Sequence, residues 1–208
     1  MPRFLTTAAD KALRDAIASI EAASSAELAI TVRDRAHRIA APAIVIGLGM
    51  AVAMLAIAAF STTPFARWQL VVLPLVVGAI GAAIAHTGPI ERVLVPPRAR
   101  HADIRGAARA AFYARKIHTT TGRTGILVFV ALHERMVELV GDIGAVAAIG
   151  QHQLDAWGTH LATTLAGGAE ATAAALAKLA PEFAAKLPHQ AGDANELADA
   201  VEREAAET

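Results

Sequence analysis

Four charged residues are the candidates for chemistry in this sequence: Glu27, Arg123, Glu138 and Asp142. Glu138 and Asp142 lie four residues apart, so both would point to one face of a strand that stayed regular through them. Together with Glu27 they could line a small acidic pocket at one edge of a sheet, with Arg123 as the neighbouring cation. The sequence therefore predicts a ligand-binding site formed by these four residues.

A second interpretation gives the same carboxylates a structural task. Glu138 could lie on an edge strand and pair with an arginine such as Arg123 or Arg135, because edge strands commonly carry charged side chains. Asp142 stands between two glycines, where an aspartate often serves as a turn residue. In that case both carboxylates are used inside the protein and neither is left for a ligand. The sequence alone leaves both interpretations open.

Other kinds of site lack the residues they need. The chain has no cysteine, which excludes disulfides, thiolate metal sites and cysteine catalysis. His133 lacks the second histidine of a zinc-binding helix, and His152 and His160 are two helical turns apart, further than one metal ion bridges. The turn at Gly122–Gly125 lacks the spacing and the lysine of a phosphate loop. We therefore predict no catalytic residue, no metal ligand and no bound cofactor.

The elements that must position these residues centre on the stretch from Gly122 to Gly144. Within it, Ile126–Ala131 is apolar on both alternating faces, as is typical of a central strand covered by helices on both sides. A tight polar turn at His133 then leads into Arg135–Val140, and so short an interval allows only an antiparallel hairpin. We expect this hairpin to form the middle of the soluble part of the chain.

Further elements precede the hairpin. Helical spacing of apolar residues predicts a first helix over 7–23, with Thr7 and Asp10 as a variant of the capping box. Alternation predicts a strand over 27–32, and a helix follows at 102–117. A strand, a helix and a further strand form the βαβ unit, whose two strands run parallel. The soluble part is therefore expected to be an α/β domain with a short mixed sheet.

The chain after the hairpin is predicted to be helical. Amphipathic spacing indicates helices over 151–166 and 170–179, and Pro181 breaks or kinks the second of these. Asn195 is a typical N-cap residue, so we expect a last helix to begin there. This final segment is acidic, since it carries the carboxylates of Asp193, Glu196, Asp199, Glu202, Glu204 and Glu207.

Two long uncharged segments interrupt the α/β pattern. No residue from 39 to 66 carries a formal charge, nor does any from 68 to 90, and 55% of the whole chain is apolar. Each segment is long enough to cross the core of a bilayer as a helix. We therefore predict two transmembrane helices, at about 40–60 and 69–87, that form an antiparallel hairpin.

The hairpin divides the chain into a first soluble part at 1–38, the transmembrane part at 39–90, and a second soluble part at 91–208 with an acidic tail. Only Arg67 lies in the loop between the spans, whereas other arginines crowd their soluble sides. By the positive-inside rule, both termini are expected in the cytoplasm. The flanking residues are Arg33, Arg35, Arg38, Arg92, Arg98, Arg100 and Arg105.

The distribution of charge also indicates the kind of partner. The formal net charge is +0, but the arginines gather at the predicted membrane boundary, where they suit anionic lipid headgroups. The lipid bilayer is therefore the first expected partner. Nucleic-acid binding is not expected, because no aromatic platform accompanies the basic residues.

The most distinctive words of the two soluble parts are Glu27, Gly122-Arg123-Thr124-Gly125, Glu134-Arg135, Glu138, Asp142-Ile143-Gly144 and Asn195-Glu196-Leu197. They resemble those of the TPM domain family, and more narrowly its small bacterial membrane members, in which two transmembrane helices interrupt the domain. The resemblance implies a three-layer α/β domain at a bacterial inner membrane. Roles proposed in that family are membrane-protein repair, receptor assistance, calcium binding and acid phosphatase activity.

One of these words departs from the family's pattern. Many members carry Asp-Asn-Gly just before the central strand, and Arg123-Thr124-Gly125 stands there instead. A guanidinium in place of a carboxylate removes a candidate ligand for calcium, which needs several oxygen ligands. Neither calcium binding nor the phosphatase activity is therefore expected at this position.

These observations favour a non-enzymatic scaffold or assistant for membrane-protein partners, with LemA-like membrane proteins among the partners that the resemblance suggests. The alternative is a membrane-tethered hydrolase of the phosphatase kind, or a calcium-binding module, that uses Arg123, Glu138 and Asp142. An acidic pocket open to solvent would favour this alternative, whereas carboxylates bonded inside the protein would favour the scaffold. The oligomeric state is not predicted.

Overall fold

The computed structural model describes residues 4, 6–34, 40–62, 64–85, 96–189 and 201–204. The chain forms two compact units, and one of them is built from two separate segments, Met1–Ala36 and Ile104–Thr208. The other unit, His37–Asp103, is inserted between these segments. The inserted unit is therefore longer than the hairpin predicted at 39–90.

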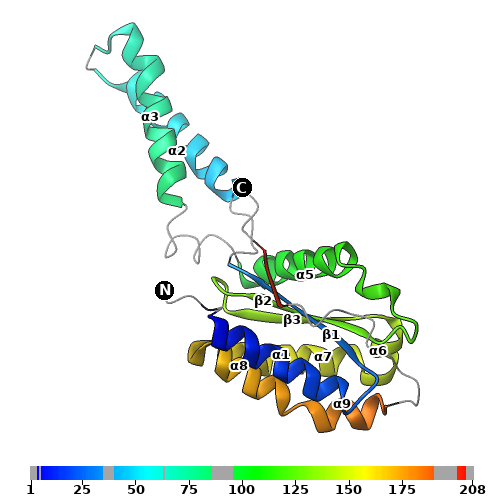
Figure 1. Cartoon of the computed structure of the whole chain (residues 1–208). Coiled ribbons are helices and arrows are strands. Elements are labelled where there is room, and N and C mark those ends of the chain that lie inside the picture. The colour runs from blue at the N-terminus through cyan, green and yellow to red at the C-terminus, as the bar shows by residue number, and fades with distance from the viewer. Residues whose placement is uncertain are drawn as a thin grey trace. The chain divides into compact units, whose positions relative to one another are not determined.

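The first unit contains a mixed four-stranded sheet in the order β3-β2-β1-β4 (Figure 1). β1 (Glu27–Arg33) pairs in parallel with β2 (Gly125–Ala131), and β2 pairs antiparallel with β3 (Met136–Gly141). The predicted βαβ pairing and the predicted hairpin are both confirmed. β4 (Val201–Glu204) pairs in parallel with the other side of β1.

Both faces of the sheet are buried, as the uniformly apolar β2 predicts. Val128, which is 1% exposed, belongs to a core formed with α1 and the helices that follow β3. Phe129, on the opposite face, belongs to a second core formed with Ile104 and Phe112 of α5 (Pro97–Ala114). A mixed sheet thus lies between two helical layers, as expected for the α/β domain.

The larger helical layer consists of α1 (Thr7–Glu21), α7 (Gln151–Thr164), α8 (Gly168–Ala177) and α9 (Ala180–Lys186). The N-cap of α1 is Thr6 rather than the predicted Thr7, since the Thr6 hydroxyl oxygen accepts from the Ala9 N–H at 3.1 Å. Trp157 ties α7 to α9, because its indole N–H donates to Glu182 at 2.9 Å and its ring packs on Phe183.

Several short elements complete this unit. The segment η1 (Ile117–Thr119) follows α5, η2 (Leu165–Gly167) joins α7 to α8, and α6 (Ile143–Ile149) follows β3 directly. α5 begins at Pro97, earlier than the predicted residue 102, which fits the tolerance of proline in the first helical turn.

The predicted last helix is partly wrong. Asn195 lies outside the described residues, but Val201–Glu204 forms strand β4 instead of continuing an acidic helix. The neighbour decides this conformation: β1 offers an open edge, so β4 gains backbone hydrogen bonds and completes the parallel pairing. The Arg203 guanidinium also donates to the Asp34 carboxylate at 2.6 Å, just beyond the end of β1.

The inserted unit contains α2 (Ala40–Phe60) and α3 (Arg67–Ala85). α2 has the predicted bounds, and α3 lies two residues before the predicted 69–87. The helices approach closely: a Cβ atom on Gly47 would lie 2.7 Å from the Gly78 carbonyl oxygen. The Gln69 side-chain oxygen accepts from the Ala66 N–H at 2.7 Å and caps the start of α3.

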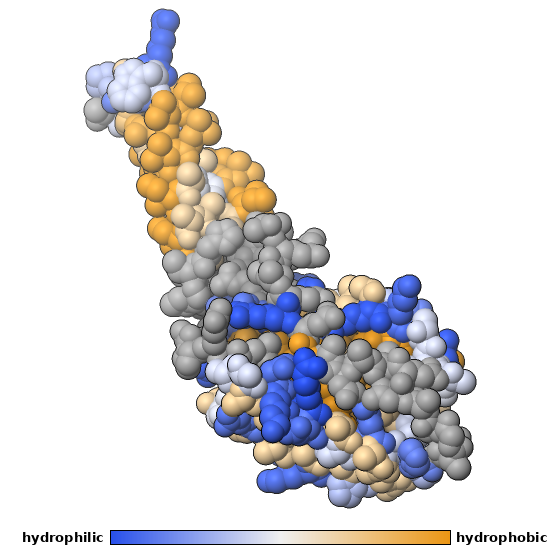
Figure 2. All heavy atoms as spheres, viewed as in Figure 1, coloured by the Kyte–Doolittle hydropathy of each residue, from blue (hydrophilic) through white to orange (hydrophobic). Residues whose placement is uncertain are grey.

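Both helices are long and apolar enough to cross a membrane. Their 21 and 19 residues give lengths of roughly 31 and 28 Å, close to the thickness of about 30 Å of a bilayer core. Only 17% and 11% of the apolar stretches are buried inside the protein, whereas the core helices of a soluble protein are mostly buried. Figure 2 shows hydrophobic side chains over the outer surface of this unit.

Candidate functional site

Glu138 lies in the middle of the edge strand β3, opposite Phe129 of β2. Its carboxylate accepts a hydrogen bond from the Arg105 Nε–H at 2.7 Å. The side chain of Glu138 is only 11% exposed, while that of Arg105 is 44% exposed. The predicted pairing of Glu138 with an arginine is therefore present, but the partner comes from α5 and is neither Arg123 nor Arg135.

Arg105 connects the layers at this edge of the sheet. It reaches Glu138 on β3, and a second guanidinium nitrogen lies 3.7 Å from the carboxylate of Asp155 on α7. The hydrogen bond and the charge of Glu138 raise the pKa of Arg105 above its ordinary value. The ion pair therefore covers the exposed edge strand and holds α5 against β3, which is a structural task.

Asp142 follows the end of β3 and has two tasks of its own. It is the N-cap of α6, and its Oδ1 accepts from the Ile143 N–H at 2.8 Å. Its Oδ2 lies 2.8 Å from the Nε of Arg123, and its side chain is 5% exposed. The expectation that Glu138 and Asp142 share one strand face is wrong, because β3 ends at Gly141 before Asp142 is reached.

The loop that carries Arg123 packs against the start of α6. A Cβ atom on Gly144 would lie 2.7 Å from the Arg123 carbonyl oxygen and 2.9 Å from that of Gly122. The Ala145 N–H also donates to the Arg123 carbonyl at 3.2 Å. The close approach requires a residue without a side chain at position 144, and it brings two distant words of the sequence into contact.

Glu27 is the first residue of β1 and is 7% exposed. It lies opposite Gly125 in the parallel pairing, and its N–H points to the Thr124 carbonyl oxygen at 3.4 Å. The structure thus brings Glu27 close to the loop that holds Arg123, whereas Glu138 lies further along the sheet under α5.

Of the four predicted residues, Arg123 and Asp142 form one ion pair, Glu138 forms another with Arg105, and Glu27 is a buried carboxylate near the first of these pairs. Among the residues that the structure describes, no three His, Asp or Glu side chains gather in a way that could hold a metal ion. One pair holds α5 against β3, and the other holds the start of α6 against the loop before β2.

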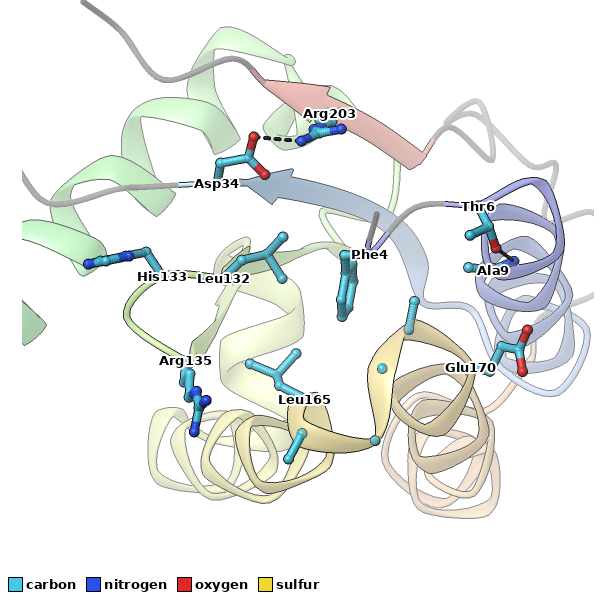
Figure 3. A pocket seen from close by; sticks show the side chains of 14 residues that line it. Phe4, Thr6, Ala9, Asp34, Leu132, His133, Arg135, Leu165, Glu170 and Arg203 are labelled. Carbon is cyan, nitrogen blue, oxygen red and sulfur yellow. Dashed lines mark hydrogen bonds and ion pairs between the residues drawn. The ribbon is translucent and has the colours of Figure 1, made fainter. Parts of the chain in front are cut away.

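A second location has the shape of a ligand site. A pocket of roughly 640 Å³ opens at the carboxyl ends of β1 and β2 (Figure 3). Apolar side chains and the backbone of the α7–α8 junction form most of its wall, and ionisable side chains stand around it. The lining residues that matter below are Phe4, Leu132, Arg135, Leu165, Glu170 and the Asp34–Arg203 ion pair.

The position of this pocket follows from the order of the strands. The chain leaves β1 and returns to β2 through α5, which covers one face of the sheet. It reaches β4, on the other side of β1, after α6 to α9, which cover the opposite face. At such a switch point the connections diverge and leave a crevice beyond the carboxyl ends of the strands, where ligands of α/β proteins commonly bind.

Sequence reasoning missed this pocket. Its residues come from the start of α1, the ends of β1 and β2, the α7–α8 junction and β4. No local motif links these segments, because only the sheet topology brings them together. The sequence holds one signal at this place, since the adjacent glycines at 167 and 168 favour the end of a helix.

The architecture is that of an α/β domain with a mixed sheet between helices, and it has a counterpart among solved structures. The chain is similar to the NMR structure of the BA42 protein from the psychrophilic bacteria Bizionia argentinensis sp. nov.. The TM-score is 0.58, the sequence identity is 16%, and the alignment covers 98% of each chain. At this identity the likeness shows the fold alone. No family model matches the sequence, and no curated protein matches it.

Proposed function

We propose that this protein is a TPM-like α/β domain, anchored in a bacterial inner membrane, that scaffolds or assists other membrane proteins and catalyses no reaction. The observation that carries the proposal is the pair α2 and α3, because both helices match a bilayer in length and expose most of their large apolar side chains. The distribution of arginines favours an arrangement with the α/β domain in the cytoplasm.

The geometry of the charged residues supports the non-enzymatic part of the proposal. A catalytic acid or base must reach its substrate. Glu138 is held by Arg105 and Asp142 lies against Arg123, and both carboxylates are largely buried. The alternative, a tethered phosphatase or a calcium-binding module, requires these carboxylates to leave their arginines.

The similarity to BA42 supports the α/β part of the proposal. The TPM assignment draws on the sequence words, two of which lie in contact where Gly144 meets the carbonyl groups of Gly122 and Arg123. LemA-like membrane proteins are the first partners to look for.

The proposal is tested by recovering the tagged full-length chain from native membranes after cross-linking in cells. The matched control is Val128→Asp, which buries an unpaired carboxylate in the core and unfolds the domain while leaving α2 and α3 unchanged. We expect particular membrane proteins to be enriched with the parent chain over the control. Equal recovery with both chains would assign the contacts to the helices and contradict a scaffolding domain.

A second measurement tests the enzymatic alternative. We expect the purified parent chain to hydrolyse p-nitrophenyl phosphate no faster than the Val128→Asp chain does. Hydrolysis that disappears in Glu138→Gln or Asp142→Asn would favour the phosphatase instead.

A further inference from the structure

The pocket at the carboxyl ends of β1 and β2 contains an arginine in an unusual backbone conformation. Arg135 has a φ of 53°, a left-handed conformation that glycine adopts without strain and other residues adopt at a cost in free energy. Arg123 shares this conformation, and its guanidinium lies against Asp142. By contrast, none of the described residues forms a hydrogen bond or an ion pair with the side chain of Arg135.

Strain that is kept at a position where glycine would fit better points to a use for the side chain. Arg135 lines the pocket at the end of the β2–β3 turn, so its guanidinium is available to an anionic group there. The other arginine of the pocket, Arg203, is already paired with Asp34. The pocket therefore offers one unpaired guanidinium among its described lining residues.

The rest of the wall is divided between apolar and acidic character. Leu132, Leu165 and Phe4 contribute apolar surface in the middle of the pocket. In Figure 3, Arg135 and Glu170 stand on opposite sides, with Leu165 and Phe4 between them. A matching ligand has an anionic end, an apolar side group next to it, and hydrogen-bond donors further along.

We propose that this pocket binds the C-terminal residues of a partner polypeptide. The Arg135 guanidinium binds the terminal carboxylate, since its planar group can donate two parallel hydrogen bonds to the two oxygens. The last apolar side chain lies against Leu132, Leu165 and Phe4, and amide N–H groups further along the peptide face Glu170. The volume of roughly 640 Å³ falls within the range of known ligand pockets.

Other anions fit this wall less well. A phosphate group is usually held by a cluster of arginines, whereas Arg135 is the one unpaired arginine among the described residues that line this pocket. A fatty acid would place a long alkyl chain beside the carboxylate of Glu170 and offer it no hydrogen-bond donor. A peptide has an apolar side chain and amide donors together, so it matches both parts of the wall.

This inference rests on the proposed scaffolding function and deepens it, because it states which part of a partner protein the domain recognises. The test uses the full-length chain in nanodiscs of phosphatidylcholine. The probes are fluorescein-labelled pentapeptides that end in leucine, either with a free carboxylate or as the C-terminal amide. Fluorescence anisotropy measures the dissociation constant of each.

We expect the free carboxylate to bind at least about tenfold more tightly than the amide, as for a hydrogen bond to a charged group. Arg135→Gln should reduce the affinity for the carboxylate to that for the amide. Arg109→Gln, which removes a charge from the exposed surface of α5, should leave both affinities unchanged. Arg135→Gly should lose binding while its melting temperature stays level or rises, because glycine removes the strain at this φ.

Four results would overturn the inference: no binding by the parent chain, equal binding of the carboxylate and the amide, full affinity in Arg135→Gln, or binding of decanoate without binding of either peptide. If the peptides fail while partners are still enriched over Val128→Asp, the pocket inference is wrong and the scaffolding function stands. If the peptides bind and no partner is enriched, the pocket inference stands and the scaffolding function is wrong.

Discussion

At the scale of single residues, arginines form ion pairs with the two carboxylates that would otherwise suggest an acidic site. Arg105 holds Glu138, and Arg123 lies against Asp142. A carboxylate that is nearly buried needs such a partner, since burying an unpaired charge is costly. Arg135 is exposed and differs from these two arginines, because its guanidinium has no such partner among the described residues. Arg123 and Arg135 share the left-handed backbone conformation, but only the first of them has an ion pair with a described residue, Asp142, that accounts for it.

Replacing Glu138 by Gln is expected to lower the free energy of unfolding by about 1 kcal/mol, because Arg105 loses a charged partner but is exposed enough to turn to water. Arg105→Gln should cost a similar amount. The double variant should lose less stability than the two single variants together, because each substitution removes the same interaction. Thermal and denaturant unfolding in detergent measures all three.

A higher melting temperature for Glu138→Gln would contradict this expectation. Relief of repulsion between neighbouring carboxylates would explain such a rise. Stabilisation of the parent chain by calcium, lost in Glu138→Gln, would add that the carboxylates form an open binding site.

Asp142 has a capping task and a charge-pairing task that two substitutions can separate. Asp142→Asn keeps an N-cap oxygen for the Ile143 N–H but loses the charge beside Arg123, so we expect a modest loss of stability. Asp142→Ala loses both and should lower the free energy of unfolding by about 2 kcal/mol. Equal stability of the two variants, measured by urea unfolding, would show that the cap contributes nothing.

At the scale of elements, hydrophobic periodicity predicted most of the fold because it reports burial. The run Ile126–Ala131 is apolar on both faces and is indeed an interior strand with a core on each side. Short elements without such a pattern were missed: α6 depends on Asp142 as its cap, and β4 depends on β1. The partner of Glu138 could not be predicted either, since Arg105 reaches it from another layer.

The contact between α2 and α3 gives a prediction at this scale. Gly47→Leu should separate the helices, because even a Cβ atom there would lie 2.7 Å from the Gly78 carbonyl oxygen. Gly49→Leu is the matched control, since nothing lies within 4 Å of a Cβ atom at that position. The chain has no cysteine, so spin labels can be placed at Ile44 and Ala83 alone.

Electron–electron distance measurements should give one short distance for the parent chain and for Gly49→Leu, and a longer or broader distribution for Gly47→Leu. If the parent and both variants give the same distribution, the helices do not depend on close contact at Gly47.

At the scale of the whole molecule, the sheet constrains any membrane arrangement of the inserted helices. β1 precedes α2 and α3, β2 follows them, and the two strands pair in parallel along their full length. Both strands must therefore stand on one side of a bilayer. Two antiparallel spans return the chain to that side, whereas a single span would divide the sheet.

In the proposed arrangement, α2 and α3 cross the inner membrane and the α/β domain stays in the cytoplasm. Cysteine labelling tests it most directly, because every introduced cysteine is the only one in the chain. Thr62 lies in the loop between the helices, and Thr159 lies on the exposed surface of α7, so each is replaced by cysteine in turn. With a membrane-impermeant maleimide on intact spheroplasts, we predict labelling of Thr62→Cys, and labelling of Thr159→Cys only after the membrane is opened. Labelling of Thr159→Cys from outside, or recovery of the chain in the soluble fraction, would rule out this arrangement.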